Sequence, residues 1–152
     1  QEQNMNEQDR EAFLQEFEAE REGSLAGFCV MGGIFSEGID LLGDRLIGAL
    51  IVGTGIPQVG TENEILKAFY DERGENGFDY AYRYPGMNKV LQAAGRVIRT
   101  QKDRGIILLL DERFCQRENL SLFPEEWSNY QVSKITSVEK QLKKFWAGEA
   151  SE

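Results

Sequence analysis

The sequence contains no histidine, and this absence narrows the chemistry that the chain can perform. Histidine is the commonest general base in enzymes, so its absence argues against a hydrolase that works with this chain alone. Only two cysteines occur, Cys29 and Cys115. They are too few for a disulfide framework and, without histidine, cannot complete a four-ligand zinc or iron–sulfur site within the chain. We therefore expect no metal site here and a reduced, cytoplasmic setting.

Long apolar segments are also missing. The longest run of apolar side chains covers only residues 106–110, whereas a membrane-spanning helix needs about 20 residues. No basic-plus-apolar signal peptide opens the sequence. We therefore expect no membrane contact. Because the first residue is Gln1 and not methionine, we expect the chain to be a piece of a longer protein.

The charge of the chain is negative overall but unevenly placed. With 152 residues, 41% hydrophobic and 28% charged, the composition is typical of one globular domain. The net charge of −9 argues against a free-standing nucleic-acid binder that relies on electrostatic attraction. Residues 1–22 carry eight acidic residues and two arginines, whereas residues 83–104 carry six basic residues and one acidic residue. The basic charge is therefore concentrated in one segment.

The hydrophobic pattern predicts strands that alternate with helices. Apolar runs typical of buried strands cover residues 25–31, 45–52 and 105–110, and helical patterns cover residues 6–21, 63–73, 85–99 and about 137–146. Residues 79–84 are expected to be extended or loop. Such alternation predicts an α/β fold with a parallel sheet covered on both faces. Ligands bind beyond the carboxyl ends of such strands, so we expect the loops after them to share one edge with the polar face of the 85–99 helix.

That helix carries an unusual polar face. At 100° per residue, Asn88, Gln92, Arg96 and Arg99 fall within roughly 80° of one another. Gly95 lies on the same side, where a missing side chain permits close approach to the backbone. Two guanidiniums one turn apart suit a polyanion, most simply the phosphates of a nucleotide. A solvated helix face remains the alternative for this pattern alone.

A glycine-rich segment, residues 32–40, follows the first predicted strand. Its three glycines permit a tight backbone turn in which the amide N–H groups can point toward an anion. Glu37 and Asp40 are the polar side chains of this segment that are long enough to contact a ligand. Its spacing differs from the Gly-x-x-x-x-Gly-Lys-Ser/Thr phosphate loop, which occurs nowhere in the chain. A plain turn is an equally good interpretation of this loop taken by itself.

Three tyrosines precede the helix at alternating positions: Tyr80, Tyr82 and Tyr84. They either stack on unpaired bases or pack a loop onto the core. The sequence leaves both interpretations open.

Two segments together resemble a known family. Residues 92–99, Gln-Ala-Ala-Gly-Arg-Val-Ile-Arg, resemble motif VI of superfamily-two helicases, and residues 33–40, Gly-Ile-Phe-Ser-Glu-Gly-Ile-Asp, resemble motif V, most closely in the XPD/DinG branch. With matching flanks, the similarity covers about residues 5–127. It implies a RecA-like three-layer α/β/α domain with a mainly parallel sheet, the second motor domain of a helicase. That domain would span residues 1–152, with residues 128–152 as a C-terminal helical extension.

The resemblance also implies roles for single residues. ATP with Mg²⁺ would lie between this domain and a first RecA-like domain, which supplies the phosphate loop and the magnesium-binding acids. Arg96 and Arg99 would act as arginine fingers, and Gln92 would help to position phosphate or the attacking water. The remaining implied contacts are Gly33, Glu37, Gly38, Asp40 and Gly95 with the nucleotide, and Ser36, Thr54, Arg83 and Lys89 with nucleic acid.

These expectations together predict an ATP-dependent DNA helicase that moves on single-stranded DNA, 5′ to 3′ by family resemblance, in repair or replication. The isolated chain is expected to hydrolyse no ATP. Two alternatives stay open: a non-catalytic RecA-like module that serves protein contacts, and a small nucleotide-binding domain that acts alone. An upstream iron–sulfur cluster and the oligomeric state lie beyond what the sequence indicates.

Overall fold

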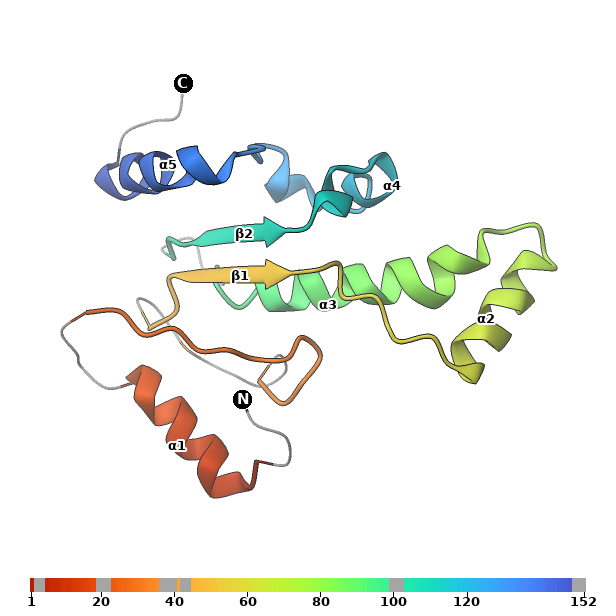
Figure 1. Ribbon diagram of the computed structural model, residues 1–152, viewed down its shortest axis with the longest axis horizontal. Coiled ribbons are helices and arrows are strands. Elements are labelled where there is room, and N and C mark those ends of the chain that lie inside the picture. The colour runs from red at the N-terminus through yellow and green to blue at the C-terminus, as the bar shows by residue number, and fades with distance from the viewer. Residues whose placement is uncertain (2–4, 19–22, 36–40, 42–44, 99–102, 149–152) are drawn as a thin grey trace. The chain divides into compact units, whose positions relative to one another are not determined.

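The computed structural model describes residues 1, 5–18, 23–35, 41, 45–98 and 103–148. The chain divides into two compact units, residues 1–122 and 123–152. The elements of the first unit are α1 (Glu7–Glu18), β1 (Gly48–Val52), α2 (Thr61–Asp71), η2 (Asp79–Arg83), α3 (Tyr84–Ala94), β2 (Ile106–Leu110), η3 (Glu112–Cys115) and α4 (Arg117–Leu120). The second unit contains η4 (Glu125–Trp127) and α5 (Ile135–Ala147) (Figure 1).

The first unit is built on a parallel pair of strands. β1 and β2 pair in register from Gly48 with Ile106 to Val52 with Leu110. The chain between them forms α2, η2 and α3, and Figure 1 shows α3 alongside β1 and running in the opposite direction. Ile51 of β1 and Val90 of α3 are both buried. The predicted α/β fold with a parallel sheet is therefore confirmed.

The two faces of the strand pair differ in burial. Ile51 is 5% exposed, whereas its neighbours Leu50 and Val52, which point to the opposite face, are 67% and 74% exposed. Leu110, the partner of Val52 in the ladder, is 47% exposed. Alternate side chains of a strand point to opposite faces, so this pattern means that α3 buries only one face of β1.

A continuous helical path leads from residue 77 into α3, so the prediction that residues 79–84 are extended or loop is wrong. Asp79 and Arg83 form an ion pair across one turn of η2. Tyr82 is 3% exposed, and its hydroxyl donates a hydrogen bond to Glu64 of α2. These tertiary contacts favour helix in a segment whose tyrosine-rich sequence suggests strand. Pro85 lies where η2 passes into α3, and because it has no N–H, the helical path lacks one backbone hydrogen bond there.

α3 ends earlier than predicted. The helix stops at Ala94, Gly95 is its C-cap, and residues 95–97 form a turn in which Arg96 N donates to the Ala93 carbonyl. Val97 is buried, and its side chain lies next to Gly105, just before β2. Burying Val97 against the start of β2 requires the chain to leave the helix direction. The expected helix through residue 99 is therefore wrong.

The predicted strand at residues 25–31 is also absent. The segment belongs to no strand pair, and Phe28 and Val30 are 84% and 61% exposed. The Phe28 carbonyl accepts a hydrogen bond from Gln1 N, and Val30 N donates to the side chain of Gln1. A buried parallel strand needs a ladder partner, and residues 25–31 form no ladder with the other residues that the structure describes.

The second unit contains an aromatic cluster and a helix. Phe123 contacts the rings of Trp127 and Tyr130 edge to face, at centroid distances of 5.1 and 5.6 Å. α5 ends at Gly148, which adopts a left-handed conformation (φ 79°), as is common after the last turn of a helix. The predicted helix at about 137–146 is confirmed. No helix in the described part of either unit is long and apolar enough to cross a membrane.

Candidate functional site

The start of the glycine-rich segment lies against α3. Gly32 has φ +78°, and a Cβ built on it would lie 3.3 Å from Cδ and Cε of Lys89. The Gly33 N–H closes a turn onto the Val30 carbonyl at 2.9 Å. The aliphatic part of Lys89 therefore packs on Gly32. Glycine is favoured at this position for two reasons: the positive φ, and the little space that Lys89 leaves for a side chain. The structure thus brings one predicted site residue of α3 next to the predicted nucleotide-binding loop.

Gln92 and Arg96 follow Lys89 toward the end of α3. Gln92 is exposed and lies three residues after Lys89, on the same side of the helix. Arg96 is half-buried in the turn after the helix, so it is not displayed on the helix face as expected. The other arginine of the predicted pair, Arg99, lies outside the described residues, as do Ser36, Glu37, Gly38 and Asp40.

The two ends of α3 lie at opposite edges of the strand pair. At the start of α3, a Cβ on Gly86 would lie 2.6 Å from the Thr54 carbonyl, in the loop after β1. At the other end, Val97 lies beside Gly105, which precedes β2. A crossover helix runs antiparallel to its strands, so Arg96 lies near their amino ends. The expectation that the whole polar face shares the carboxyl edge is therefore wrong.

Thr54 and Arg83 lie near that carboxyl edge, but Thr54 is buried and Arg83 is already ion-paired. Thr54 is 4% exposed, and its hydroxyl has no hydrogen-bond partner among the described residues. The guanidinium of Arg83 is ion-paired with Asp79 and lies 5.5 Å from the centroid of the Phe78 ring. A phosphate contact by Arg83 would therefore compete with a carboxylate already in place.

The three tyrosines separate into two groups. Tyr80 stacks on Tyr70 with ring centroids 3.8 Å apart, and its hydroxyl donates to Glu75 at 2.6 Å. The carboxylate of Glu75 raises the pKa of Tyr80 to about 12, because the hydrogen bond favours the protonated phenol. Tyr80 and the buried Tyr82 thus pack within the helical hairpin. Tyr84 is 36% exposed and contacts Tyr80 edge to face.

Asp111 follows β2 and has a structural role. It is the N-cap of η3, where its side chain accepts a hydrogen bond from the backbone N–H of Arg113 at 2.9 Å. It also forms an ion pair with the guanidinium of Arg113 at 2.7 Å, and this contact lowers the pKa of the Asp111 carboxyl to about 2. Asp111 therefore caps the short helix that follows β2.

The chemistry of the site fits an anion better than a cation. Lys89, Gln92 and Arg96 all carry hydrogen-bond donors, two of them cationic. Within the described ranges, no group of three or more histidine, cysteine or acidic side chains could hold a metal ion. Donors of this kind can bind phosphate oxygens presented from outside the chain.

Comparison with known proteins shows similarity to one family, the helicases. The model of the helicase C-terminal domain matches residues 1–130. A probable ATP-dependent helicase of Methanocaldococcus jannaschii is 26% identical over 137 residues, which cover 83% of this chain and 21% of that protein. The ATP-dependent DNA helicase DinG of Photobacterium profundum is 36% identical over 87 residues, 56% of this chain and 12% of that protein.

The transcription and repair factor IIH helicase subunit XPD of Dictyostelium discoideum is 31% identical over 99 residues. The aligned part is 63% of this chain and 12% of that subunit. The chain thus spans between 12% and 21% of the length of these relatives.

Proposed function

Because the chain belongs to the helicase C-terminal domain family, we propose that it is the second motor domain of an ATP-dependent DNA helicase of the XPD/DinG type. The observation that supports this proposal is the contact of Lys89 on α3 with Gly32, at the start of the glycine-rich segment. In the full-length protein, ATP with Mg²⁺ would bind between this domain and a first RecA-like domain. A cytoplasmic location stays a prediction.

Arg96 and Arg99 are the proposed arginine fingers. ATP supplies the phosphoryl group, and a guanidinium that reaches its outermost phosphate stabilises the negative charge that develops during transfer. Gln92, exposed near the end of α3, would donate a hydrogen bond to phosphate or to the attacking water. Gly95 is the C-cap of α3, so Arg96 lies in the turn that follows the helix.

The remaining proposed contacts divide between nucleotide and DNA. Glu37 and Asp40 would link the state of the nucleotide to the loop, and the backbone of Gly33, Gly38 and Gly95 would allow close approach of the nucleotide. Single-stranded DNA is the proposed partner of Ser36, Thr54, Arg83 and Lys89. Lys89 is the best placed of the described residues in this group, because its stem packs on Gly32 while an ammonium group keeps a strong preference for water or an anion.

The arginine-finger role is tested by Arg99→Ala in the full-length protein. We expect DNA-stimulated ATP turnover to fall by about a thousandfold, because a finger contributes mainly to stabilising the transition state. ATP binding, measured by titration with a fluorescent nucleotide, should change much less. ATP turnover at the wild-type rate would show that Arg99 is not a finger.

Arg117→Ala is the matched control. Arg117 is an exposed arginine in α4, outside the glycine-rich loop and the Gln92–Arg99 segment. Its removal changes the net charge by the same amount as Arg99→Ala, so a purely electrostatic effect on DNA binding would appear in both variants. We expect ATP turnover of the Arg117 variant to match the wild type.

A further inference from the structure

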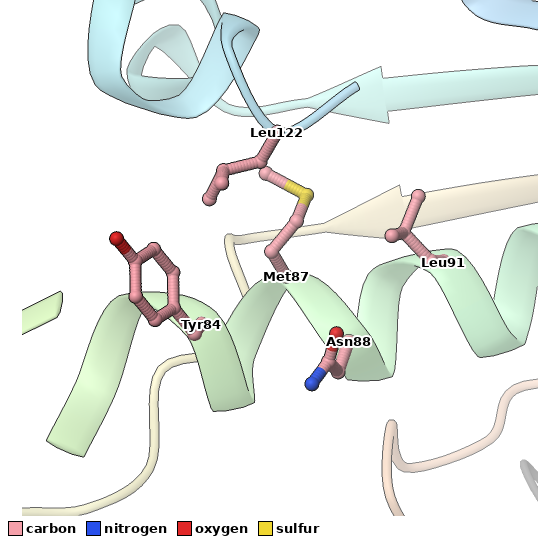
Figure 2. Close-up of a pocket in the computed structure, with 5 residues that line it drawn as sticks. All are labelled: Tyr84, Met87, Asn88, Leu91 and Leu122. Carbon is pink, nitrogen blue, oxygen red and sulfur yellow. The ribbon is translucent and has the colours of Figure 1, made fainter. Parts of the chain in front are cut away.

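A small pocket lies on the flank of α3 near its start. It has a volume of about 220 Å³ and is lined by Tyr84, Met87, Asn88, Leu91 and Leu122. Figure 2 shows four of these side chains on α3, with Leu122 reaching toward Met87 from the segment after α4. Residues at these spacings on a helix share one side. The pocket therefore combines an aromatic ring, an amide and apolar walls.

The aromatic ring that lines the pocket packs against a second tyrosine. Tyr84 contacts Tyr80 edge to face at 5.2 Å, and Tyr80 in turn stacks on Tyr70 of α2. The hydroxyl of Tyr80 is fixed by its hydrogen bond to Glu75. Tyr84 itself remains 36% exposed. A ring that is supported but partly uncovered loses little freedom when a second flat ring stacks on it.

The position and size of the pocket are suited to a small, flat ligand. The start of α3 lies beside the loop that follows β1, at the carboxyl edge of the strands, where open α/β sheets bind ligands. Pockets for drug-sized ligands have volumes of about 300–1,000 Å³, so this smaller one suits a single flat ring system. The Asn88 amide offers both a donor and an acceptor to the polar edge of such a ring.

We propose that this pocket binds one unpaired nucleobase of the single-stranded DNA, with the base stacked on Tyr84 and its edge hydrogen-bonded to Asn88. The inference rests on the proposed helicase function. It extends that function, because none of the DNA contacts proposed above is a contact with a base. The pocket gives the domain a contact that does not depend on charge. Such a contact suits a chain whose net charge of −9 disfavours DNA.

The test compares base-containing and abasic oligonucleotides of equal length on the full-length protein. Affinity is measured by fluorescence anisotropy without ATP, over a range of salt concentrations. Stacking of a base on an aromatic ring adds to affinity whatever the base is, because every base has a flat face. We therefore expect Tyr84→Leu to weaken binding of the base-containing strand by about tenfold with an unchanged salt slope, and to leave binding of the abasic strand unchanged. Tyr84→Phe keeps the ring and should bind as the wild type does.

A second measurement keeps the proposal testable if Tyr84→Leu fails to fold. A strand carrying 2-aminopurine should lose fluorescence on binding the wild type, because stacking quenches it, and Asn88→Ala should reduce both this quenching and the affinity. Two results would overturn the proposal that the pocket binds a base. The first is equal affinity of the wild type for base-containing and abasic strands. The second is equal affinity of the wild type and Tyr84→Leu for the base-containing strand. A full-length protein with no DNA-stimulated ATP turnover would instead overturn the proposed function, and the pocket with it.

Discussion

At the scale of single residues, the pair Asp111–Arg113 makes a contribution to stability that depends on pH. The guanidinium and the backbone N–H of Arg113 lower the pKa of the Asp111 carboxyl from its ordinary value of 3.8 to about 2. A carboxyl whose pKa is lower in the folded state stabilises the fold above its unfolded pKa, and this stabilisation is lost as the pH falls through the folded pKa. We expect the loss between about pH 4 and pH 2.

The variant Asp111→Asn tests this pair. Asparagine keeps an oxygen that can cap η3 but removes the charge, so we expect a loss of less than about 1 kcal/mol at pH 7, because Arg113 remains open to solvent. Urea unfolding at pH 7, 4 and 3 measures it. The difference between wild type and variant should shrink toward pH 3. A difference that does not change with pH would show that the ionised carboxylate of Asp111 does not stabilise the fold.

The helical pattern of the sequence predicts the position of some site residues and not of others. Gln92 is exposed on α3, as its position in the helical pattern predicts. Arg96 is not on the helix, because a pattern of apolar spacings does not determine where a helix stops. The low helix propensity of Gly95 favours an end there, but burial of Val97 beside Gly105 is a tertiary contact that no local pattern contains.

At the scale of elements, the position of α3 depends on two facing glycines. A Cβ on Gly86 would lie 2.6 Å from the Thr54 carbonyl and 3.0 Å from Ile56 N, and Gly55 faces it with φ +67°. Both contacts are with backbone, which cannot move aside as a flexible side chain can. We therefore expect Gly86→Ala to destabilise the fold by about 1–3 kcal/mol, as overpacking does.

Gly48→Ala provides the comparison for this variant. Gly48 begins β1, and a Cβ there would meet only the Ile106 carbonyl at 3.4 Å, an ordinary contact. We expect its effect to stay within about 0.5 kcal/mol. Urea unfolding followed by circular dichroism compares the two variants. Equal stability of Gly86→Ala and wild type would show that the loop after β1 does not fix α3.

The elements were predictable where local pattern and packing agree. β1, β2, α2 and α5 lie close to where apolar spacing places them. Residues 25–31 have the composition of a buried strand, yet a strand also needs backbone hydrogen bonds to a neighbouring strand, and the segment forms no ladder with the described residues. Residues 79–83 are helical because contacts with Glu64 and Tyr70 outweigh local preference. Both errors therefore concern partners far away in the sequence.

At the scale of the whole molecule, charge and motifs together predict what the purified chain does by itself. Its donors, among them Lys89, Gln92 and Arg96, suit a phosphate, but its sequence contains no Gly-x-x-x-x-Gly-Lys-Ser/Thr loop to hold one. An arginine finger stabilises charge on a nucleotide that other groups must already bind and position. We therefore expect no measurable ATP turnover from the 152-residue chain, measured as phosphate release with and without single-stranded DNA.

The same chain should bind single-stranded DNA only weakly and with strong sensitivity to salt. Its basic charge is confined mainly to residues 83–104, while residues 1–22 are acidic and repel phosphate. Anisotropy titrations at low and at physiological salt measure this, and Lys89→Met should make the dependence on salt less steep by about one charge. ATP turnover by the chain alone would contradict the division of the active site between two domains. It would favour the alternative of a nucleotide-binding domain that acts by itself.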